Sequence, residues 1–205
     1  MIDLYTWSTP NGRKISMMLE ACGLEYRVHP VNIGAQEQFA PEFLKISPNN
    51  KIPAIVDQDG IDSQPTSVFE SGAILLYLAE KTGKFLPESP RERLEVMEWL
   101  MFQMGSFGPY LGQAHHFNMF VKEPVPYAQQ RYQEEAYRLW SVLNKRLEGR
   151  EFVAGELSIA DFAIYPWAAR FEFQRIKPSD YPAVHDWMQR MEAFDFVKTG
   201  MAIPA

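Results

Sequence analysis

Three short segments in the first half of the chain carry residues that could bind a ligand through backbone groups or polar side chains. The first is Ile52-Pro53, at the head of an expected strand, where proline cannot donate a ladder hydrogen bond. A cis bond there would turn the N–H and C=O of Ile52 toward a cleft, where they can pair with the backbone of a bound peptide. An ordinary trans proline at a strand start is the alternative, because X-Pro bonds in folded proteins are cis only ~5–6% of the time.

The second segment is Phe69-Glu70-Ser71-Gly72, just before an expected helix. Ser71 is placed to be the N-cap of that helix, and simple capping would explain the serine. Glu70 is harder to explain in this way, because a stabilising acidic residue more commonly lies within the first turn. The Ser71 hydroxyl and the free N–H groups of the helix would bind a carboxylate, and Glu70 an ammonium. The γ-glutamyl end of a peptide carries both groups.

The third segment, Ser8-Thr9-Pro10-Asn11-Gly12, begins the first expected helix. Capping alone would explain these residues. The same hydroxyl and amide donors, at the positive end of a helix, would also stabilise an anion. For a bound thiol this means a lower pKa, which in such surroundings falls from ~8.5 to as low as ~3.5–7.5.

Hydrophobic periodicity places these segments on alternating strands and helices. Expected strands cover residues 2–7, 26–31, 54–57 and 66–69. Expected helices run from the starter segment 8–12 to residue 22, and over 41–46 and 71–81. Gly23 and Gly83 stand where C-cap glycines belong. The order β-α-β followed by β-β-α predicts a mixed four-stranded sheet of the thioredoxin-like type, and such a sheet places a proline like Pro53 beside its substrate.

Beyond residue 84 the strand patterns end. Residues 90–104, 126–147, 158–173 and 182–194 carry helical periodicity, and the glycine- and proline-rich residues 105–126 are expected to form a linking segment over a cleft. The sequence therefore predicts an α/β domain over residues 1–83, a linker over 84–89 and an all-helical domain over 90–205.

Composition excludes several classes of function. The 205 residues carry 20 Lys and Arg against 26 Asp and Glu, a net charge of −6 that argues against nucleic acid as a partner. No run approaches the ~20 apolar residues of a membrane helix, and the first residues do not resemble a signal peptide, so a cytoplasmic protein is expected. Cys22 is the only cysteine, which rules out an intrachain disulfide. No metal is expected, because the four histidines are not spaced as metal ligands are. They are His29, His115, His116 and His185.

These motifs carry a family resemblance over essentially the whole chain. Residues 49–54 (Asn-Asn-Lys-Ile-Pro-Ala) and 69–78 (Phe-Glu-Ser-Gly-Ala-Ile-Leu-Leu-Tyr-Leu) resemble the cytosolic glutathione transferases. Residues 9–12 (Thr-Pro-Asn-Gly), 46–54 and 108–117 (Gly-Pro-Tyr-Leu-Gly-Gln-Ala-His-His-Phe) resemble the bacterial Nu class of that superfamily. The resemblance implies a thioredoxin-like domain followed by an all-helical domain, and glutathione-dependent disulfide-bond reductase activity.

The resemblance also implies roles for individual residues. Thr9 and Asn11 match the catalytic contacts to the glutathione sulfur, with Ser8 as a competitor for that role. Ile52 matches the backbone partner of the cysteinyl unit, and Glu70 and Ser71 match the γ-glutamyl binders. The remaining implied glutathione-binding positions are Gln38 on the glycyl side, Lys51, Pro53, and Arg131 of the helical domain.

The expectation is therefore a homodimeric enzyme that uses glutathione as co-substrate, with one or two molecules per site. It would reduce a small-molecule or peptide disulfide by thiol–disulfide exchange. Cys22 lies near the end of the first helix on its apolar face, so the enzyme would contribute no reactive sulfur of its own. Two alternatives remain: conjugation of glutathione to apolar electrophiles, and a regulatory protein that binds glutathione without turnover.

Overall fold

A four-stranded sheet forms the centre of the N-terminal part of the chain. The computed structural model describes residues 1–204, and its strands are β1 (Ile2–Thr6), β2 (Tyr26–Pro30), β3 (Ala54–Asp57) and β4 (Thr66–Phe69), in the order β2-β1-β3-β4. β1 pairs with β2 in parallel, whereas the β1–β3 and β3–β4 pairs are antiparallel. The predicted mixed sheet is confirmed.

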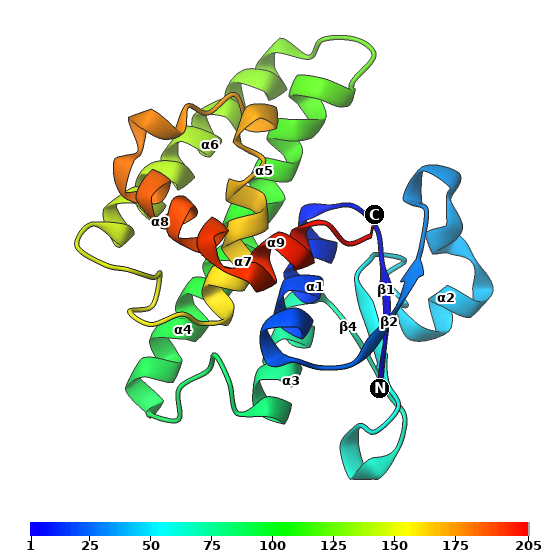
Figure 1. Cartoon of the computed structure of the whole chain (residues 1–205). Helices are drawn as coiled ribbons and strands as arrows, with labels where there is room; N and C mark the ends of the chain where they lie inside the picture. Colours follow the sequence, from blue (N-terminus) through cyan, green and yellow to red (C-terminus); the bar gives the residue numbers. More distant parts are fainter. Residues whose placement is uncertain (205) are drawn as a thin grey trace. The chain divides into compact units, whose positions relative to one another are not determined.

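Helices cover both faces of this sheet (Figure 1). α1 (Pro10–Cys22) and α3 (Ser71–Thr82) pack against each other on one face. Both end at a left-handed glycine, as predicted: Gly23 has φ 69° and Gly83 has φ 65°. The short α2 (Pro41–Ile46) packs on the opposite face, where Phe43 contacts Tyr5 of β1.

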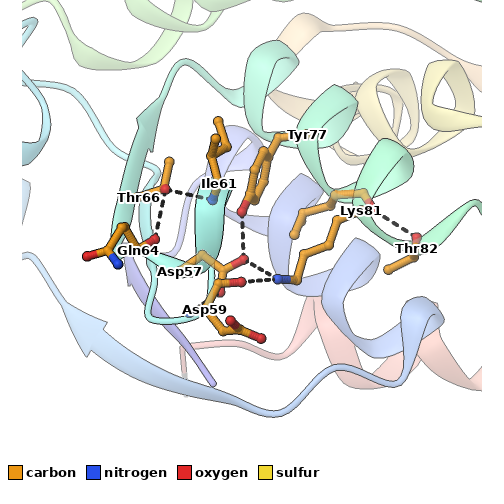
Figure 2. A network of polar contacts seen from close by, with 9 residues as sticks. Asp57, Asp59, Ile61, Gln64, Thr66, Tyr77, Lys81 and Thr82 are labelled. Atoms are coloured by element: carbon orange, nitrogen blue, oxygen red, sulfur yellow. Dashed lines mark hydrogen bonds and ion pairs between the residues drawn. The ribbon is translucent and has the colours of Figure 1, made fainter.

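A cluster of polar side chains lies at the end of the sheet where β3 ends (Figure 2). The Tyr77 hydroxyl and the Lys81 ammonium of α3 both approach Oδ2 of Asp57, at 2.7 and 2.8 Å. Lys81 also donates to the main-chain carbonyl of Asp59. Burial alone would raise the pKa of Asp57, but the hydrogen bonds from Lys81 and Tyr77 hold it below its usual value. This network ties α3 to the sheet.

The C-terminal segment packs with the N-terminal unit. α9 (Asp195–Met201) lies on α1 so closely that a Cβ on Gly200 would be 2.5 Å from the Cα of Met17. The Ser16 hydroxyl donates to the Gly200 carbonyl at 2.6 Å. Residues 194–204 thus belong with residues 1–84, whereas the sequence placed them in the helical domain. The segment packs on α1, and the two bonded residues Ser16 and Gly200 are 184 positions apart, so no local sequence signal indicates this contact.

The second compact unit covers residues 85–193 and is helical. Its main helices are α4 (Pro90–Phe102), α5 (Gly108–His115), α6 (Pro126–Leu147), α7 (Ile159–Ala168) and α8 (Pro182–Ala193). Wider π-helical turns, Gln103–Phe107 and His116–Phe120, precede and follow α5, so most of the predicted linking segment 105–126 is helical. Gly108 does not break the helix there. Its missing Cβ leaves room for the Gln103 side chain, whose Oε1 accepts the Gly108 N–H at 2.9 Å.

Buried polar contacts fix the start of α7. Ser158 and Asp161 form the predicted capping box. Asp161 Oδ1 also accepts the Val153 N–H at 2.9 Å and the Trp187 indole N–H at 3.0 Å. Burial raises the pKa of Asp161 to about 6, although these hydrogen bonds oppose the shift. Since every partner belongs to the helical unit, Asp161 holds that unit together.

Candidate functional site

Three of the predicted segments emerge at the same end of the sheet. Tyr5, near the end of β1, pairs with Ala54, the first residue of β3. Ala54 in turn pairs with Phe69, the last residue of β4. The residues that follow β1, precede β3 and follow β4 therefore lie close together, at the end of the sheet opposite the Asp57 network.

The start of α1 carries the predicted thiol-binding residues. Thr9 is the N-cap, and its Oγ1 accepts the Gly12 N–H at 3.2 Å. Because the hydroxyl oxygen is the acceptor in that bond, the Thr9 proton is directed elsewhere. Asn11 is half-buried in the first turn. Ser8 is exposed, and its Oγ accepts a hydrogen bond from Nη2 of Arg13 at 3.0 Å.

The peptide bond between Ile52 and Pro53 is cis. Within the described residues, neither the N–H nor the C=O of Ile52 has a main-chain partner. The Ile52 side chain packs against the cluster around Phe43, and the Ser47 hydroxyl donates to the Lys51 carbonyl at 2.8 Å. The loop is thus fixed on both sides of a residue that offers one donor and one acceptor. Lys51 itself is exposed.

β4 passes into α3 through an unusual backbone conformation at Glu70. Glu70 occupies the N-cap position with φ 69° and ψ 116°, and Ser71 is the first residue of the helix. The prediction that Ser71 is the N-cap was wrong, because the turn out of β4 is made one residue earlier. A positive φ is uncommon for a residue other than glycine and often marks a functional position. Asn49 donates to Oε1 of Glu70 at 3.1 Å, which ties the 47–53 loop to this turn.

A buried lysine stands behind Ser71. Nζ of Lys14, on α1, donates to Oγ of Ser71 at 3.2 Å, and the Lys14 side chain is 0% exposed. Burial lowers the pKa of Lys14 to about 7, although the charge of Glu70 opposes the shift. Lys14 was missed in the sequence, where a lysine is expected at the surface. Its spacing of four residues from Met18, on the apolar face of the helix, was the available signal.

Two other predicted glutathione-binding residues, Gln38 and Arg131, lie outside these three segments of the sequence. Gln38 sits in a 3₁₀ turn (Glu37–Phe39), half-buried, and its Oε1 is a buried atom with no partner within the described residues. Arg131 belongs to the second unit, where it lies exposed on α6. Their roles, like those of Ser8, Thr9, Asn11 and Lys51, stay predictions.

Cys22 is the last residue of α1, 13 positions after Thr9 and hence about 20 Å along the helix axis from it. The side chain is buried, with its Sγ 3.6 Å from Oγ1 of Thr82. Burial raises the pKa of this thiol. A high pKa and little exposure both disfavour the reactive thiolate.

The described residues contain neither a metal-binding cluster nor a membrane-spanning helix. Among residues 1–204, no group of three or more His, Cys, Asp and Glu side chains could hold a metal ion. His115 is buried beside Trp167 and Phe173, and burial lowers its pKa to about 4, so it is neutral at pH 7. No helix in the described part of the chain is long and apolar enough to cross a bilayer.

Comparison with known proteins connects these features to a family. Residues 1–80 match the glutathione S-transferase N-terminal domain, and residues 107–195 match the glutathione S-transferase C-terminal domain. Disulfide-bond oxidoreductase YfcG of Escherichia coli (strain K12) is 54% identical over 195 residues, which cover 94% of this chain and 91% of YfcG.

Two crystal structures of glutathione transferases are similar over nearly the entire chain. One, from Pseudomonas fluorescens Pf-5, has two glutathione molecules bound; its TM-score is 0.95 at 44% identity, with 99% of this chain and 93% of that chain covered. The other, from Pseudomonas putida, has one glutathione disulfide bound per subunit. Its TM-score is 0.95 at 42% identity, with 100% of this chain and 92% of that chain covered.

Proposed function

The chain belongs to the glutathione transferase family, and on that premise we propose that it is an enzyme that binds glutathione and reduces disulfide bonds with it. The main observation in favour is that the segments 8–12, 52–53 and 69–72, which offer groups complementary to those of glutathione, meet at one end of the sheet. The only cysteine of the sequence is buried at the far end of α1. A protein that lacks a reactive sulfur there must take it from its ligand. The name of YfcG and the ligands of the two similar structures agree with this reaction.

The residues present fit the functional groups of glutathione. Ser71 and the first turn of α3 supply donors for the γ-glutamyl carboxylate, and the Glu70 carboxylate supplies a partner for the ammonium. The N–H and C=O of Ile52, which have no main-chain partner among residues 1–204, suit the two complementary backbone groups of the cysteinyl unit. Pro53, joined to Ile52 by the cis peptide bond, is a further proposed contact. Gln38 is proposed to bind on the glycyl side, and Lys51 and Arg131 are further proposed glutathione-binding residues.

Thr9 and Asn11 are the proposed thiolate-stabilising residues. Both are at the N-terminus of a 13-residue helix, where a hydroxyl proton, an amide N–H and the helix dipole all favour a negative charge. Exchange is fastest when the pKa of the attacking thiol is close to ambient pH, so a moderate lowering serves the reaction best. In the overall reaction two glutathione thiols become one glutathione disulfide, while the substrate disulfide is reduced to two thiols.

We further propose that the enzyme is a cytoplasmic homodimer that acts on small-molecule or peptide disulfides. Glutathione keeps thiols reduced in the cytosol, which is where a glutathione-consuming reductase has its co-substrate. The resemblance to dimeric glutathione transferases motivates the homodimer. Sedimentation equilibrium tests it, and a monomeric mass would contradict this part of the proposal.

Steady-state kinetics of Asn11→Ala, Thr9→Ala and Ser8→Ala test the assignment. With glutathione and a small dialkyl disulfide, we expect Asn11→Ala or Thr9→Ala to lower kcat by at least tenfold, while Ser8→Ala has the smaller effect because Ser8 is exposed. Unchanged rates in both Asn11→Ala and Thr9→Ala would remove the thiol-activation proposal. Faster turnover of 1-chloro-2,4-dinitrobenzene than of any disulfide would identify conjugation instead. Glutathione binding without turnover of either would identify a regulatory protein.

A further inference from the structure

A fully buried lysine requires a physical explanation. Lys14 is 0% exposed although ammonium groups are strongly hydrated, and its burial is costly unless the charge is compensated. A Met or Leu would fill the same space on the apolar face of α1 without that cost. The Lys14 side chain reaches from α1 to the first residue of α3, where Nζ meets the Ser71 hydroxyl.

The contact fixes the direction of the Ser71 hydroxyl. The protonated form of Lys14 can only donate hydrogen bonds, so in that form the Ser71 oxygen is the acceptor in the 3.2 Å contact. The hydroxyl proton must then point away from Nζ of Lys14. Ser71 is thereby preset as a donor, with its oxygen already engaged from behind.

The charge of Lys14 acts in the same direction. Its Nζ contacts Ser71 in the first turn of α3, and the N-terminus of this 12-residue helix already favours anions. Glu70, which precedes Ser71, is the negative group whose charge favours protonated Lys14. A carboxylate bound at the same helix end would add to that effect, because a nearby opposite charge favours the charged form of a group. Binding of a carboxylate and protonation of Lys14 therefore support each other.

We propose that Lys14 is a positioning and specificity-determining residue, which acts through Ser71 to make the N-terminus of α3 selective for the α-carboxylate of a γ-glutamyl group. The inference rests on the proposed function, since it deepens the role of Ser71 in binding glutathione. Lys14 does not touch the ligand, because its side chain is completely enclosed. Its contribution is to preset the hydroxyl and to place a positive charge behind it.

The test compares two ligands and three variants. The ligands are S-methylglutathione, whose blocked thiol keeps thiol titration out of the measurement, and its analogue without the α-carboxylate, S-methyl-(4-aminobutanoyl)-cysteinylglycine. The variants are Lys14→Met, which keeps the volume without the charge, Lys14→Arg, which keeps a donor and a charge, and Ser71→Ala. Ser16→Ala is the matched control, because Ser16 is equally buried on α1 but bonds to Gly200 and not to Ser71. Titration calorimetry gives the Kd of each pair.

We expect Lys14→Met to weaken S-methylglutathione binding about tenfold while leaving the affinity for the analogue within twofold of wild type, since hydrogen bonds to charged groups commonly contribute this much. Lys14→Arg should restore at least part of the loss. In a Ser71→Ala background the Lys14→Met effect should fall below threefold, because Lys14 acts through the missing hydroxyl. Ser16→Ala should leave the ratio of the two affinities unchanged, even if it lowers the Tm.

The outcomes separate this inference from the proposed function. If wild type binds neither ligand, or binds both equally, the assigned γ-glutamyl site is wrong and the inference fails with it. If wild type prefers S-methylglutathione and Lys14→Met keeps that preference, only the role of Lys14 is wrong. Should the variants not fold, nuclear magnetic resonance of wild type with ¹³C-labelled lysine replaces them. The Lys14 ε-carbon should shift with S-methylglutathione and not with the analogue, and equal behaviour toward both ligands would overturn the inference.

Discussion

Substitution of Gly12 by alanine is expected to damage the site through the backbone of α1. A Cβ at this position would lie 2.5 Å from the Trp7 carbonyl oxygen and 2.3 Å from Oγ1 of Thr6. Carbon–oxygen contacts are ordinarily ~3.3 Å or longer, so the start of α1 must move by about 0.8 Å. The Trp7 carbonyl belongs to the backbone and cannot rotate away as a flexible side chain would. Overpacking of this kind typically costs ~1–3 kcal/mol of stability.

The larger effect is on turnover, because the residues that move are Thr9 and Asn11. A misplacement of ~1 Å in a catalytic site can cost ~10²-fold in rate, so we expect kcat/KM for glutathione-dependent disulfide reduction to fall by one to two orders of magnitude. Urea unfolding measures the stability change in parallel. Gly105→Ala is the matched control, because a Cβ on Gly105 meets no atom within 4 Å. Wild-type kcat/KM and stability in Gly12→Ala would refute the reasoning.

Two further predictions concern stability. Asp161→Ala removes the acceptor for the Trp187 indole and for buried main-chain N–H groups, and unsatisfied buried donors cost ~1–3 kcal/mol each. We therefore expect the free energy of unfolding, measured in urea, to fall by ~3–5 kcal/mol. A decrease below ~1 kcal/mol would contradict the role of this cluster. The pKa of Asp57 is lower in the folded state than in the unfolded chain, so its network with Lys81 and Tyr77 stabilises the fold above pH ~4 and this contribution disappears as pH falls through the lowered pKa. Between pH 4.5 and 2.5 the unfolding free energy should therefore decline less in Asp57→Asn than in wild type, and equal slopes in acid unfolding curves would count against the network.

The elements of the N-terminal unit follow directly from local sequence signals. Strand alternation in β1, the helical spacing in α1 and the glycines that end α1 and α3 are local signals, and the structure has each within one or two residues of its predicted place. The segment 105–126 was misread for a local reason too. Glycine and proline usually interrupt helices, but here Gly108 accommodates the Gln103 side chain, and Pro109 follows a wider π-helical turn in an uninterrupted run of helical backbone.

The site could be predicted in part. Helix starters and a proline at a strand head are visible in the sequence, and strand pairing brings the segments they mark to one end of the sheet. The position of the turn into α3 was not visible, because nothing local distinguishes Glu70 from Ser71 as the residue that takes the positive φ. The role of Lys14 depends on contact with a residue 57 positions later, which only the packing of α1 on α3 creates.

The central claim is that the reacting sulfur comes from the bound glutathione and not from the protein. The most direct test is turnover by Cys22→Ala, measured with glutathione and a small dialkyl disulfide below the temperature at which the variant unfolds. The buried thiol with its raised pKa predicts a kcat within about twofold of wild type and an unchanged affinity for glutathione. Loss of turnover in a folded variant that still binds glutathione would contradict the account.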